Sequence, residues 1–261
     1  MVFAGGCASR NLARAGGGDL RSLLVLIVIG LFAYISIGGL LGPVRADVSA
    51  RTSIDLTAAG GTTIPSLLAQ AFGLSASTAA LIATAVIAGI AILYCLSDPS
   101  FRSSPVHIFA GIGIGLCVIA GWALTGLAYD DMAAQPISPV SLTFVRPAGD
   151  TLEWFERFTA GPVPSFAVTT TLGAILGALV ASVTSGRFRL TTFANPADTV
   201  RNLFGAALMG IGGVMALGCT IGQGVTGVST LALGSLLTFV AIVTGGMFGI
   251  KRMEAILLAE V

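Results

Sequence analysis

The chain has 261 residues, of which 55% are hydrophobic and only 10% are charged, and its mean hydropathy is +0.95. Soluble domains carry about 25% charged residues, so this composition excludes a soluble globular protein and predicts an all-α integral membrane protein. The net charge of +1 argues against a nucleic-acid-binding surface. The four cysteines lack CxxC spacing and there is one histidine, so we expect neither a metal site nor a cofactor.

The hydropathy pattern predicts about six transmembrane helices, because about twenty apolar residues are needed to cross the hydrocarbon core. The first predicted span follows a polar segment at residues 1–21, and the fifth is short enough to lie near the lower limit for crossing. In chain order the predicted spans are Ser22–Leu41, Ser75–Leu96, Pro105–Tyr129, Phe166–Ser185, Asn202–Gly218 and Leu231–Ile250.

The longest polar connection is residues 130–165, which carries five prolines and is expected to lie outside the membrane. Two short helices are predicted outside the spans, an amphipathic one at Ile64–Phe72 and a surface helix at Asp150–Phe158.

A glycine-rich segment at residues 218–227 separates the fifth and sixth predicted spans. It contains Cys219, Thr220, Gly222, Gln223 and Gly224 where lipid would require an uninterrupted apolar helix. Irregular backbone at membrane depth is tolerated only where it is buried in protein or lines a wet cavity. We therefore expect this loop to line a substrate path.

A second cysteine loop occurs near the start of the chain, at Phe3–Arg10. Aligning Cys7 with Cys219 also pairs Ala4 with Ala216, Gly6 with Gly218 and Ala8 with Thr220. After a slip of one residue, Ser22–Leu24 falls on Ser235–Leu237, where each begins an apolar span. Internal repeats with broken helices at matching positions are typical of secondary transporters.

The repeat predicts three parts of the chain. Residues 1–129 form a partial first repeat, with the cysteine loop and three spans, and residues 130–165 form the extramembrane connection. Residues 166–261 form the second repeat, with three spans and its own cysteine loop. Two spans precede Cys219 but only six residues precede Cys7, so we expect the chain to lack the N-terminal helices of a complete first repeat. The alternative is a truncated form that does not transport.

The distribution of basic residues predicts the orientation in the membrane, because cytoplasmic loops are enriched in Lys and Arg. If the N-terminal loop is cytoplasmic, that side also holds the C-terminus and nine of the thirteen basic residues. These nine are Arg10, Arg14, Arg21, Arg102, Arg187, Arg189, Arg201, Lys251 and Arg252. The opposite side holds Arg45, Arg51, Arg146 and Arg157. The two cysteine loops then enter the membrane from opposite faces, as inverted repeats.

Four stretches of the sequence resemble the YeeE/YedE family, bacterial membrane proteins that include thiosulfate-uptake transporters. They are Ala4–Ser9, Ser141–Val145, Gly186–Leu190 and Leu208–Gly224. The resemblance implies an hourglass-shaped inner-membrane transporter in which two loops meet near mid-membrane and thiols contact the sulfur substrate. Cys7 and Cys219 match those loop positions. Transporting members of the family use a third cysteine ahead of the second loop, whereas this chain has none from residue 118 to 218.

Thiosulfate is a dianion with a soft terminal sulfur, and a path that conducts it must attract the ion without holding it. A thiol is a weak, polarizable donor, and glycine loops expose backbone N–H groups next to helix N-termini that favour anions. The expected substrate-binding residues are Cys7, Ser9, Cys219, Thr220, Gly222, Gln223 and Gly224. The partners implied are a small sulfur anion, the lipid bilayer and a cytoplasmic sulfur carrier of the TusA type.

Two other functions are compatible with the same residues. A membrane sulfur-relay or redox protein would pass persulfide or electrons between Cys7 and Cys219, but it needs a thiolate, and only Cys7 has a basic residue nearby in sequence, Arg10. A non-transporting scaffold for a cytoplasmic sulfur carrier is the third reading. Cys95 and Cys117 lie inside apolar spans, where a cysteine is usually a small packing residue.

Overall fold

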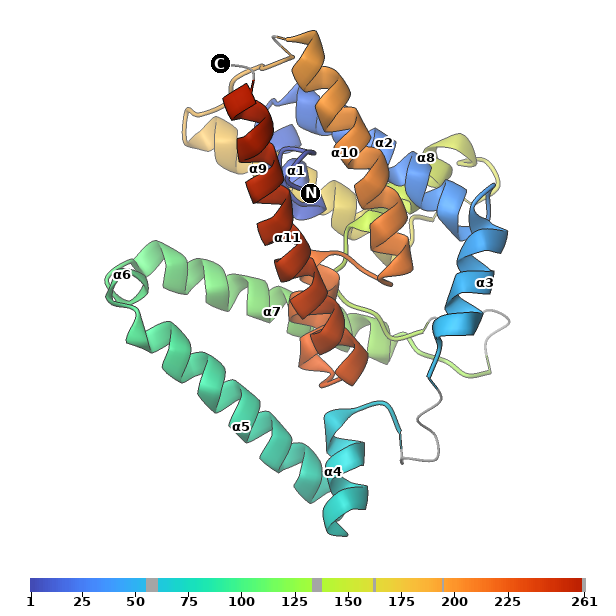
Figure 1. Ribbon diagram of the computed structural model, residues 1–261, viewed down its shortest axis with the longest axis vertical. Helices are drawn as coiled ribbons and strands as arrows, with labels where there is room; N and C mark the ends of the chain where they lie inside the picture. Colours follow the sequence, from blue (N-terminus) through green and yellow to red (C-terminus); the bar gives the residue numbers. More distant parts are fainter. Residues whose placement is uncertain (55–60, 133–137, 162, 194, 260–261) are drawn as a thin grey trace. The chain divides into compact units, whose positions relative to one another are not determined.

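The computed structural model describes residues 1–54, 61–132, 138–161, 163–193 and 195–259, and Figure 1 shows that these residues are mainly helical. Among them there is no β-strand, only isolated backbone bridges that join Asp19 to Thr191 and Thr63 to Ala232. The α-helices are α1 (Ala8–Gly16), α2 (Leu20–Ile37), α3 (Gly42–Thr52), α4 (Ile64–Phe72), α5 (Ala76–Ser97), α6 (Pro99–Arg102), α7 (Pro105–Leu127), α8 (Val145–Glu156), α9 (Phe166–Thr184), α10 (Pro196–Met215) and α11 (Leu233–Ala259). The predicted all-α fold is confirmed.

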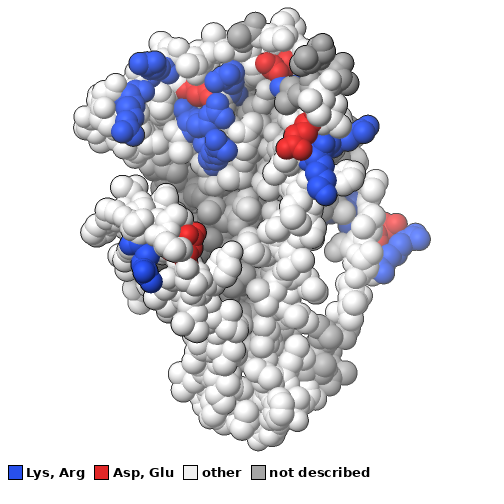
Figure 2. Space-filling model, turned by 60° about the vertical axis from the view of Figure 1, so that its left-hand side comes forward, with Lys and Arg blue, Asp and Glu red and all other residues white. Residues whose placement is uncertain are grey.

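Five of these helices are long and apolar enough to cross a membrane, namely α2, α5, α7, α9 and α11. They coincide with the first, second, third, fourth and sixth predicted spans, so the chain is a multi-pass membrane protein. At most 39% of the residues in these spans are buried inside the molecule, which leaves their apolar side chains available to lipid. On the face drawn in Figure 2, charged side chains gather in clusters separated by broad uncharged surface.

The fifth predicted span differs from the structure. Residues 202–215 lie in α10, but this helix begins six residues earlier. Unlike the five helices above, α10 does not combine the length and the hydropathy of a membrane span. The first turns of α10 are polar, since they contain Asp198 and Arg201. Asn195 caps the helix, and its side chain accepts from the N–H of Ala197 at 3.0 Å. Its small residues pack closely on a neighbouring helix, since a Cβ on Gly210 would lie 2.6 Å from the carbonyl oxygen of Ile29 in α2.

The short helices were predicted with mixed success. Helix α4 has the predicted bounds, with Thr63 as its N-cap and Gly73 in the left-handed region at φ 65°. Helix α8 begins five residues before the predicted surface helix, and its first turns are buried. Helix α1 falls in the polar segment 1–21, and α3 falls in the connection between the first two predicted spans; no helix was predicted at either place.

The chain divides into two compact units. The first comprises Met1–Ser53, Thr143–Gln223 and Thr238–Val261, and the second comprises Ile54–Leu142 and Gly224–Leu237. These units interleave along the chain, whereas the predicted repeats are consecutive, so the repeat boundaries at 1–129, 130–165 and 166–261 stay a prediction.

The first unit is built around α2, which packs against α1, α8 and α10 (Figure 1). Helix α8 approaches α2 closely, because a Cβ on Gly30 would lie 2.8 Å from the carbonyl oxygen of Ala148. The Tyr34 hydroxyl also bridges the two helices, at 2.7 Å from Asp150 Oδ1 and 2.6 Å from Glu153 Oε2. Part of the predicted extramembrane connection is therefore buried against a membrane span.

Polar contacts hold the second unit together around the extended residues 138–142. Thr125 Oγ1 in α7 lies 2.7 Å from the carbonyl oxygen of Val140, and Ser141 donates to the carbonyl oxygen of Val118 at 2.8 Å. Thr226 donates to the carbonyl oxygen of Leu142 at 2.7 Å. These hydroxyls thus bind carbonyl oxygens of both the extended segment and α7.

Candidate functional site

The first cysteine element is a loop that turns sharply into α1. Gly5 and Gly6 have φ values of 72° and 148°, which favour glycine, and Cys7 follows as the extended N-cap residue of α1. The carbonyl oxygen of Cys7 accepts from the backbone N–H of Asn11 at 3.0 Å, which is the first hydrogen bond of the helix. The thiol therefore stands at a helix N-terminus, where the backbone N–H groups point outward.

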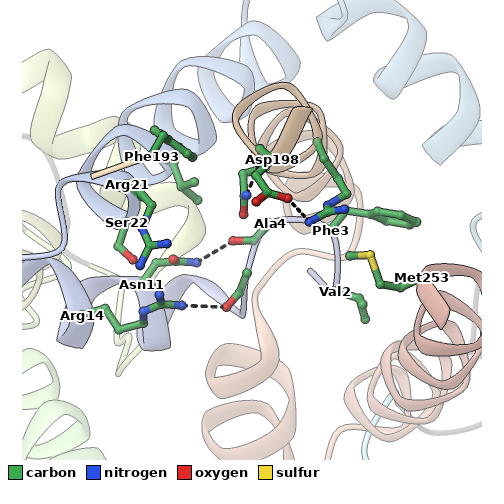
Figure 3. Close-up of a pocket in the computed structure, with 14 residues that line it drawn as sticks. Val2, Phe3, Ala4, Asn11, Arg14, Arg21, Ser22, Phe193, Asp198 and Met253 are labelled. Carbon is green, nitrogen blue, oxygen red and sulfur yellow. Dashed lines mark hydrogen bonds and ion pairs between the residues drawn. The ribbon is translucent and has the colours of Figure 1, made fainter. Parts of the chain in front are cut away.

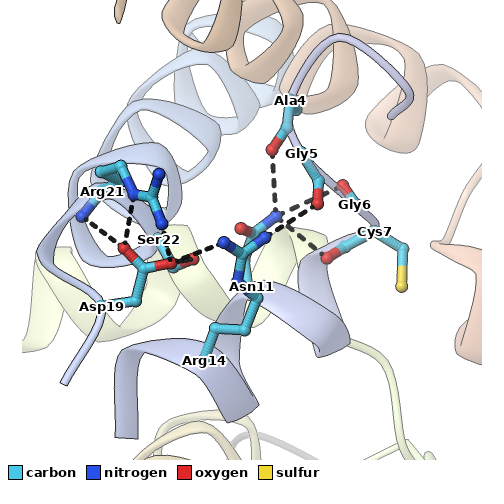
Figure 4. A network of polar contacts seen from close by, with 9 residues as sticks. All are labelled: Ala4, Gly5, Gly6, Cys7, Asn11, Arg14, Asp19, Arg21 and Ser22. Carbon is cyan, nitrogen blue, oxygen red and sulfur yellow. Dashed lines mark hydrogen bonds and ion pairs between the residues drawn. The ribbon is translucent and has the colours of Figure 1, made fainter. Parts of the chain in front are cut away.

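The Asn11 side chain fixes the shape of this loop. It is 1% exposed, and Figure 3 shows its amide aimed at the carbonyl oxygen of Ala4, 3.4 Å away. The same nitrogen lies 3.3 Å from the carbonyl oxygen of Gly6 and 3.1 Å from that of Cys7 (Figure 4). The buried amide thus contacts three carbonyl oxygens, and one of them, that of Cys7, also accepts the first hydrogen bond of α1.

The Cys7 thiol has a hydroxyl beside it. Its Sγ lies 3.2 Å from Ser9 Oγ, and the side chain is partly exposed. Figure 4 shows the sulfur pointing away from Arg14 and Arg21, so these guanidinium groups do not contact it there. The structure brings together two of the predicted site residues, Cys7 and Ser9.

The second cysteine element repeats this design before a helical segment at residues 220–229. The carbonyl oxygen of Cys219 accepts from the N–H of Gln223 at 2.8 Å, and its sulfur accepts from the N–H of Gly222 at 3.3 Å. Cys219 is buried, at 7% exposure, whereas Cys7 is not. Cys219 thus caps its helix with both the backbone and the thiol.

Gln223 occupies the place of Asn11. Both residues stand four positions after the cysteine, and Gln223 Nε2 donates to the carbonyl oxygen of Ala216 at 2.7 Å, as Asn11 does to Ala4. The side chain of Gln223 is 9% exposed, and its Oε1 has no hydrogen-bond partner in the described part of the chain. The Gln223 amide therefore holds the second cysteine loop in place, and the N–H that it donates to Ala216 is not available to a substrate.

Thr143 is a neighbour of the second thiol that the sequence analysis did not select. Its hydroxyl lies 3.8 Å from Cys219 Sγ, and a Cβ on Gly222 would come within 2.6 Å of Thr143 Oγ1. A side chain at position 222 would therefore have to displace the Thr143 side chain. The only signal in the sequence was that Thr143 belongs to the stretch Ser141–Val145, which matches the YeeE/YedE pattern.

The two elements also end alike. At the end of the first element, the backbone N–H of Leu20 donates to the carbonyl oxygen of Thr191 at 2.9 Å. At the end of the second element, the backbone N–H of Leu233 donates to the carbonyl oxygen of Thr62 at 3.1 Å. Leu20 and Leu233 correspond after the predicted slip of one residue, so the same kind of backbone pairing closes both elements.

A charged cluster follows the first element only. Asp19, the N-cap residue of α2, is bound by Arg14 at 2.7 Å and by Arg21 at 3.0 Å. Burial by itself would raise the pKa of Asp19, but the hydrogen bond from Arg21 and the charges of both arginines outweigh it and lower the pKa below its ordinary value. Asp19 is thus held ionised between α1 and α2.

The remaining predicted residues have less defined surroundings. Thr220 is half-buried at the start of its helix, and Gly224 lies in the π-helical turn Gly222–Gly227. Cys7 and Cys219 belong to the same compact unit, but no hydrogen bond between described residues joins the two elements. Cys95 and Cys117 are exposed on α5 and α7. The described residues contain no cluster of three His, Cys, Asp or Glu side chains suited to a metal.

The family model described as sulphur transport matches residues 1–248, a region that contains both cysteine elements. The chain belongs to the sulphur transport family. This confirms the resemblance to YeeE/YedE proteins.

Two curated relatives in the sulphur transport family carry the name thiosulfate transporter TsuA. The protein from Spirochaeta thermophila is 29% identical over 252 residues, which are 94% of this chain and 71% of the relative. The protein from Escherichia coli is 25% identical over 245 residues, which are 86% of this chain and 62% of the relative. Both alignments cover most of this chain.

Proposed function

We propose that this protein carries thiosulfate across the bacterial inner membrane along a path lined by its two cysteine elements. The observation that carries the proposal is the repeated design, in which Cys7 and Cys219 each cap a helix N-terminus inside a membrane protein of the sulphur transport family. The names of the two relatives support the choice of thiosulfate.

The chemistry of both elements suits a dianion that must pass without being trapped. A helix N-terminus carries partial positive charge, which attracts anions. The side chains at the thiols are neutral hydroxyls, Ser9 and Thr143, and these bind an anion more weakly than a lysine would. We assign Cys7, Ser9, Cys219 and Thr220 as donors along the path. Gly222, Gln223 and Gly224 then shape the second loop.

In this proposal the N-terminal loop and the C-terminus face the cytoplasm, as the distribution of basic residues predicts. The thiols act as hydrogen-bond donors and leave the transported ion chemically unchanged, so the protein is a transporter and not an enzyme. A cytoplasmic sulfur carrier of the TusA type would receive the imported sulfur. The hourglass arrangement of inverted repeats belongs to the same proposal.

Uptake of radiolabelled thiosulfate into proteoliposomes that contain the purified chain tests the proposal. We expect Cys7→Ala and Cys219→Ala each to reduce the initial rate by at least about tenfold, since each removes a donor to an ionic substrate. Cys95→Ala is the matched control, because Cys95 is exposed on α5, and it should transport normally. Normal uptake by both loop variants would show that the thiols are not part of the path.

The same preparation separates the rival functions. In a sulfur-relay protein the thiolate of Cys7 or Cys219 would attack the terminal sulfur of thiosulfate, the S–S bond would break and sulfite would leave. Intact-protein mass spectrometry would then detect one added sulfur atom on the cysteine. A scaffold would bind a sulfur carrier but give no uptake in the wild type. Either result would replace transport as the function of this chain.

A further inference from the structure

A cavity of about 250 Å³ lies beside the first cysteine loop, and three arginines line it, Arg14, Arg21 and Arg201 (Figure 3). We propose that this cavity, the arginine pocket, binds a small divalent oxyanion before or after it passes the Cys7 thiol. The choice of thiosulfate as the physiological ion rests on the proposed function. The binding of an oxyanion rests on the pocket alone.

The pocket is formed within one compact unit by residues of α1, α2, α10 and α11, by the first cysteine loop and by Phe193. Arg14 comes from α1, Arg21 from α2 and Arg201 from α10, while the backbone at Ala4 and Gly5 forms another part of the wall. Helix α10 meets this loop closely, because a Cβ on Gly205 would lie 2.5 Å from the backbone nitrogen of Ala4. Segments far apart in sequence therefore converge on one set of guanidinium groups.

Two of the arginines are held in place before any ligand arrives. Arg14 Nη2 lies 2.7 Å from Asp19 Oδ2, and Arg21 Nε lies 3.0 Å from Asp19 Oδ1. Asp19 is itself fixed, since it accepts from the N–H of Arg21 at 3.1 Å and from the hydroxyl of Ser22 at 3.2 Å. Arg14 also donates to the carbonyl oxygen of Gly5 at 3.2 Å (Figure 4). Preorganised donors bind an anion with less loss of side-chain entropy.

Arg201 provides the donor that lacks a partner. It pairs with Asp198 in its own helix, but its Nε is buried and has no hydrogen-bond partner among the described residues. A buried guanidinium N–H without an acceptor is unfavourable, and such groups call for a specific explanation. An oxyanion in the arginine pocket would supply the missing acceptor.

Charge and size agree with a small dianion. Three arginines face two carboxylates, Asp19 and Asp198, so the cluster keeps one net positive charge in the absence of a ligand. A cavity of about 250 Å³ is smaller than the pockets that hold drug-sized ligands, and it suits a small ion. The forked guanidinium groups match the oxygens of a tetrahedral oxyanion.

The position of the arginine pocket connects it to the path. Ala4 and Gly5 line the pocket, and Cys7 follows two residues later with its sulfur turned away from Arg14 and Arg21 (Figure 4). The short turn at residues 4–6 thus lies between the arginines and the thiol. An ion held in the pocket would be concentrated next to the first cysteine element.

Isothermal titration of the purified full chain in detergent with sodium thiosulfate, at low ionic strength, tests the proposal. Arg201→Gln should weaken binding by at least about tenfold, because it removes a charge-assisted donor. Arg201→Lys should recover part of the affinity, since it restores the charge without the fork. Arg51→Gln is the matched control, because Arg51 is exposed on α3 and its ion pair among the described residues is with Asp47 of the same helix.

Sodium sulfate is the second probe. The arginines contact oxygens and not sulfur, so sulfate should bind within about tenfold of thiosulfate and lose affinity equally in Arg201→Gln. Binding that requires the terminal sulfur, or equal affinity in Arg201→Gln and Arg51→Gln, would overturn the arginine pocket. Thermal unfolding of each variant shows whether it is folded.

The outcome is independent of the transport mechanism. If Cys7→Ala and Cys219→Ala transport normally while Arg201→Gln still loses oxyanion binding, the thiol path fails and the arginine pocket stands. If the cysteine variants lose uptake but Arg201→Gln binds and transports like the wild type, the path stands and the pocket fails.

Discussion

The two cysteine elements share one backbone plan but differ in length by a single residue. Helix α1 after Cys7 has nine residues, whereas the helical segment 220–229 after Cys219 has ten and contains the π-helical turn Gly222–Gly227. A π-turn closes its hydrogen bond one residue later than an α-turn, so it absorbs one extra residue without moving the ends of the helix. The one-residue slip in the sequence repeat therefore has a structural cause.

The elements also differ in how they stabilise the same strained positions. Gly5 and Gly18 have positive φ in the first element, and the corresponding positions in the second are Leu217 and Leu231, at φ 54° and 55°. The first element adds an ionic cluster around Asp19, while the polar contacts of the second are made by neutral amides and hydroxyls. The shared geometry thus depends on the cysteine cap and the amide four residues later, and not on charge.

Glycine substitutions should give the largest difference between the elements. A Cβ on Gly16, at the end of α1, would lie 2.6 Å from Ala178 Cβ and 2.9 Å from the backbone nitrogen of Leu179 in α9. Gly16→Ala should therefore lower stability by about 3 kcal/mol, because a helix backbone must move. Gly222→Ala should lose only about 1 kcal/mol, since it meets the Thr143 side chain. Thermal unfolding in detergent measures both.

Gly212→Ala is the control for these glycine variants. Gly212 lies inside α10, and no described atom lies within 4 Å of an added Cβ apart from its own helix and chain neighbours. The substitution should raise stability by about 0.5–1 kcal/mol through helix propensity. Adding Thr143→Ala to Gly222→Ala should recover part of the loss. A Gly16→Ala variant as stable as the wild type would disprove the close α1–α9 packing.

The buried amides should give the next largest effect. Asn11→Leu leaves the carbonyl oxygens of Ala4, Gly6 and Cys7 without the side-chain donor, and we expect a loss of about 2 kcal/mol. Gln223→Met removes one such donor and also a buried acceptor without a partner, so the loss should be about 1 kcal/mol or less. Unfolding by denaturant would rank the two, and a larger loss in Gln223→Met would reverse our comparison.

The ionic cluster should make the first element sensitive to acid. The folded protein lowers the pKa of Asp19, so its stabilisation is present above the unfolded pKa near about 4 and is lost as pH falls through the lower folded value. Asp19→Asn should reduce stability by about 1–2 kcal/mol at pH 7 and by less at pH 3. The measurement is the melting temperature of both proteins from pH 3 to 7.

The difference between wild type and Asp19→Asn isolates this site from other carboxylates. Glu153 also has a lowered pKa, chiefly through the hydrogen bond from Tyr34, and Asp98 has one through hydrogen bonds from Ser100. Both groups are present in the two proteins, so their contributions cancel. A constant difference across the pH range would mean that Asp19 does not carry the acid sensitivity.

Relief of backbone strain should give the smallest effect and the opposite sign. Leu217 has φ 54° and is 83% exposed, so Leu217→Gly removes strain and loses little packing inside the molecule. We expect a gain of about 0.5 kcal/mol, the difference between left-handed strain and the entropy of glycine. At the corresponding first-element position, Gly5→Ala should instead destabilise. Melting temperatures that rise in Leu217→Gly and fall by a similar amount in Gly5→Ala would support the equivalence of positions 5 and 217. A lower melting temperature in Leu217→Gly would contradict it.

Five of the six predicted spans coincide with long apolar helices, because length and hydropathy are local properties that lipid enforces directly. The sequence placed the remaining span at residues 202–218, whereas α10 begins at Pro196 with polar first turns and falls short of the combined length and hydropathy criteria that the other five helices meet. It missed α1 and α3 because their polar composition resembles a connection. Helix α1 is shaped by contacts that are remote in sequence, such as the packing of Gly16 on α9.

The candidate site was predicted in part. The alignment of Cys7 with Cys219 located both thiols and the loops before them, and the slip located the spans after them. Thr143 was not selected, because nothing local to it indicates that it lies against Gly222. Asn11 was not selected either, although it stands at the same distance from Cys7 as Gln223 from Cys219. The periodicity of a repeat does not reveal which polar residue is buried.

The sequence by itself determined the membrane class, the family resemblance and the paired cysteine loops, because composition, span length and repeated motifs are written along the chain. Only the tertiary structure decided that Asn11 and Gln223 close the loops and that Arg14, Arg21 and Arg201 line one cavity. These groups come from segments separated by up to about two hundred residues, and their meeting depends on helix packing. No local pattern encodes such contacts, because packing is a property of the folded chain.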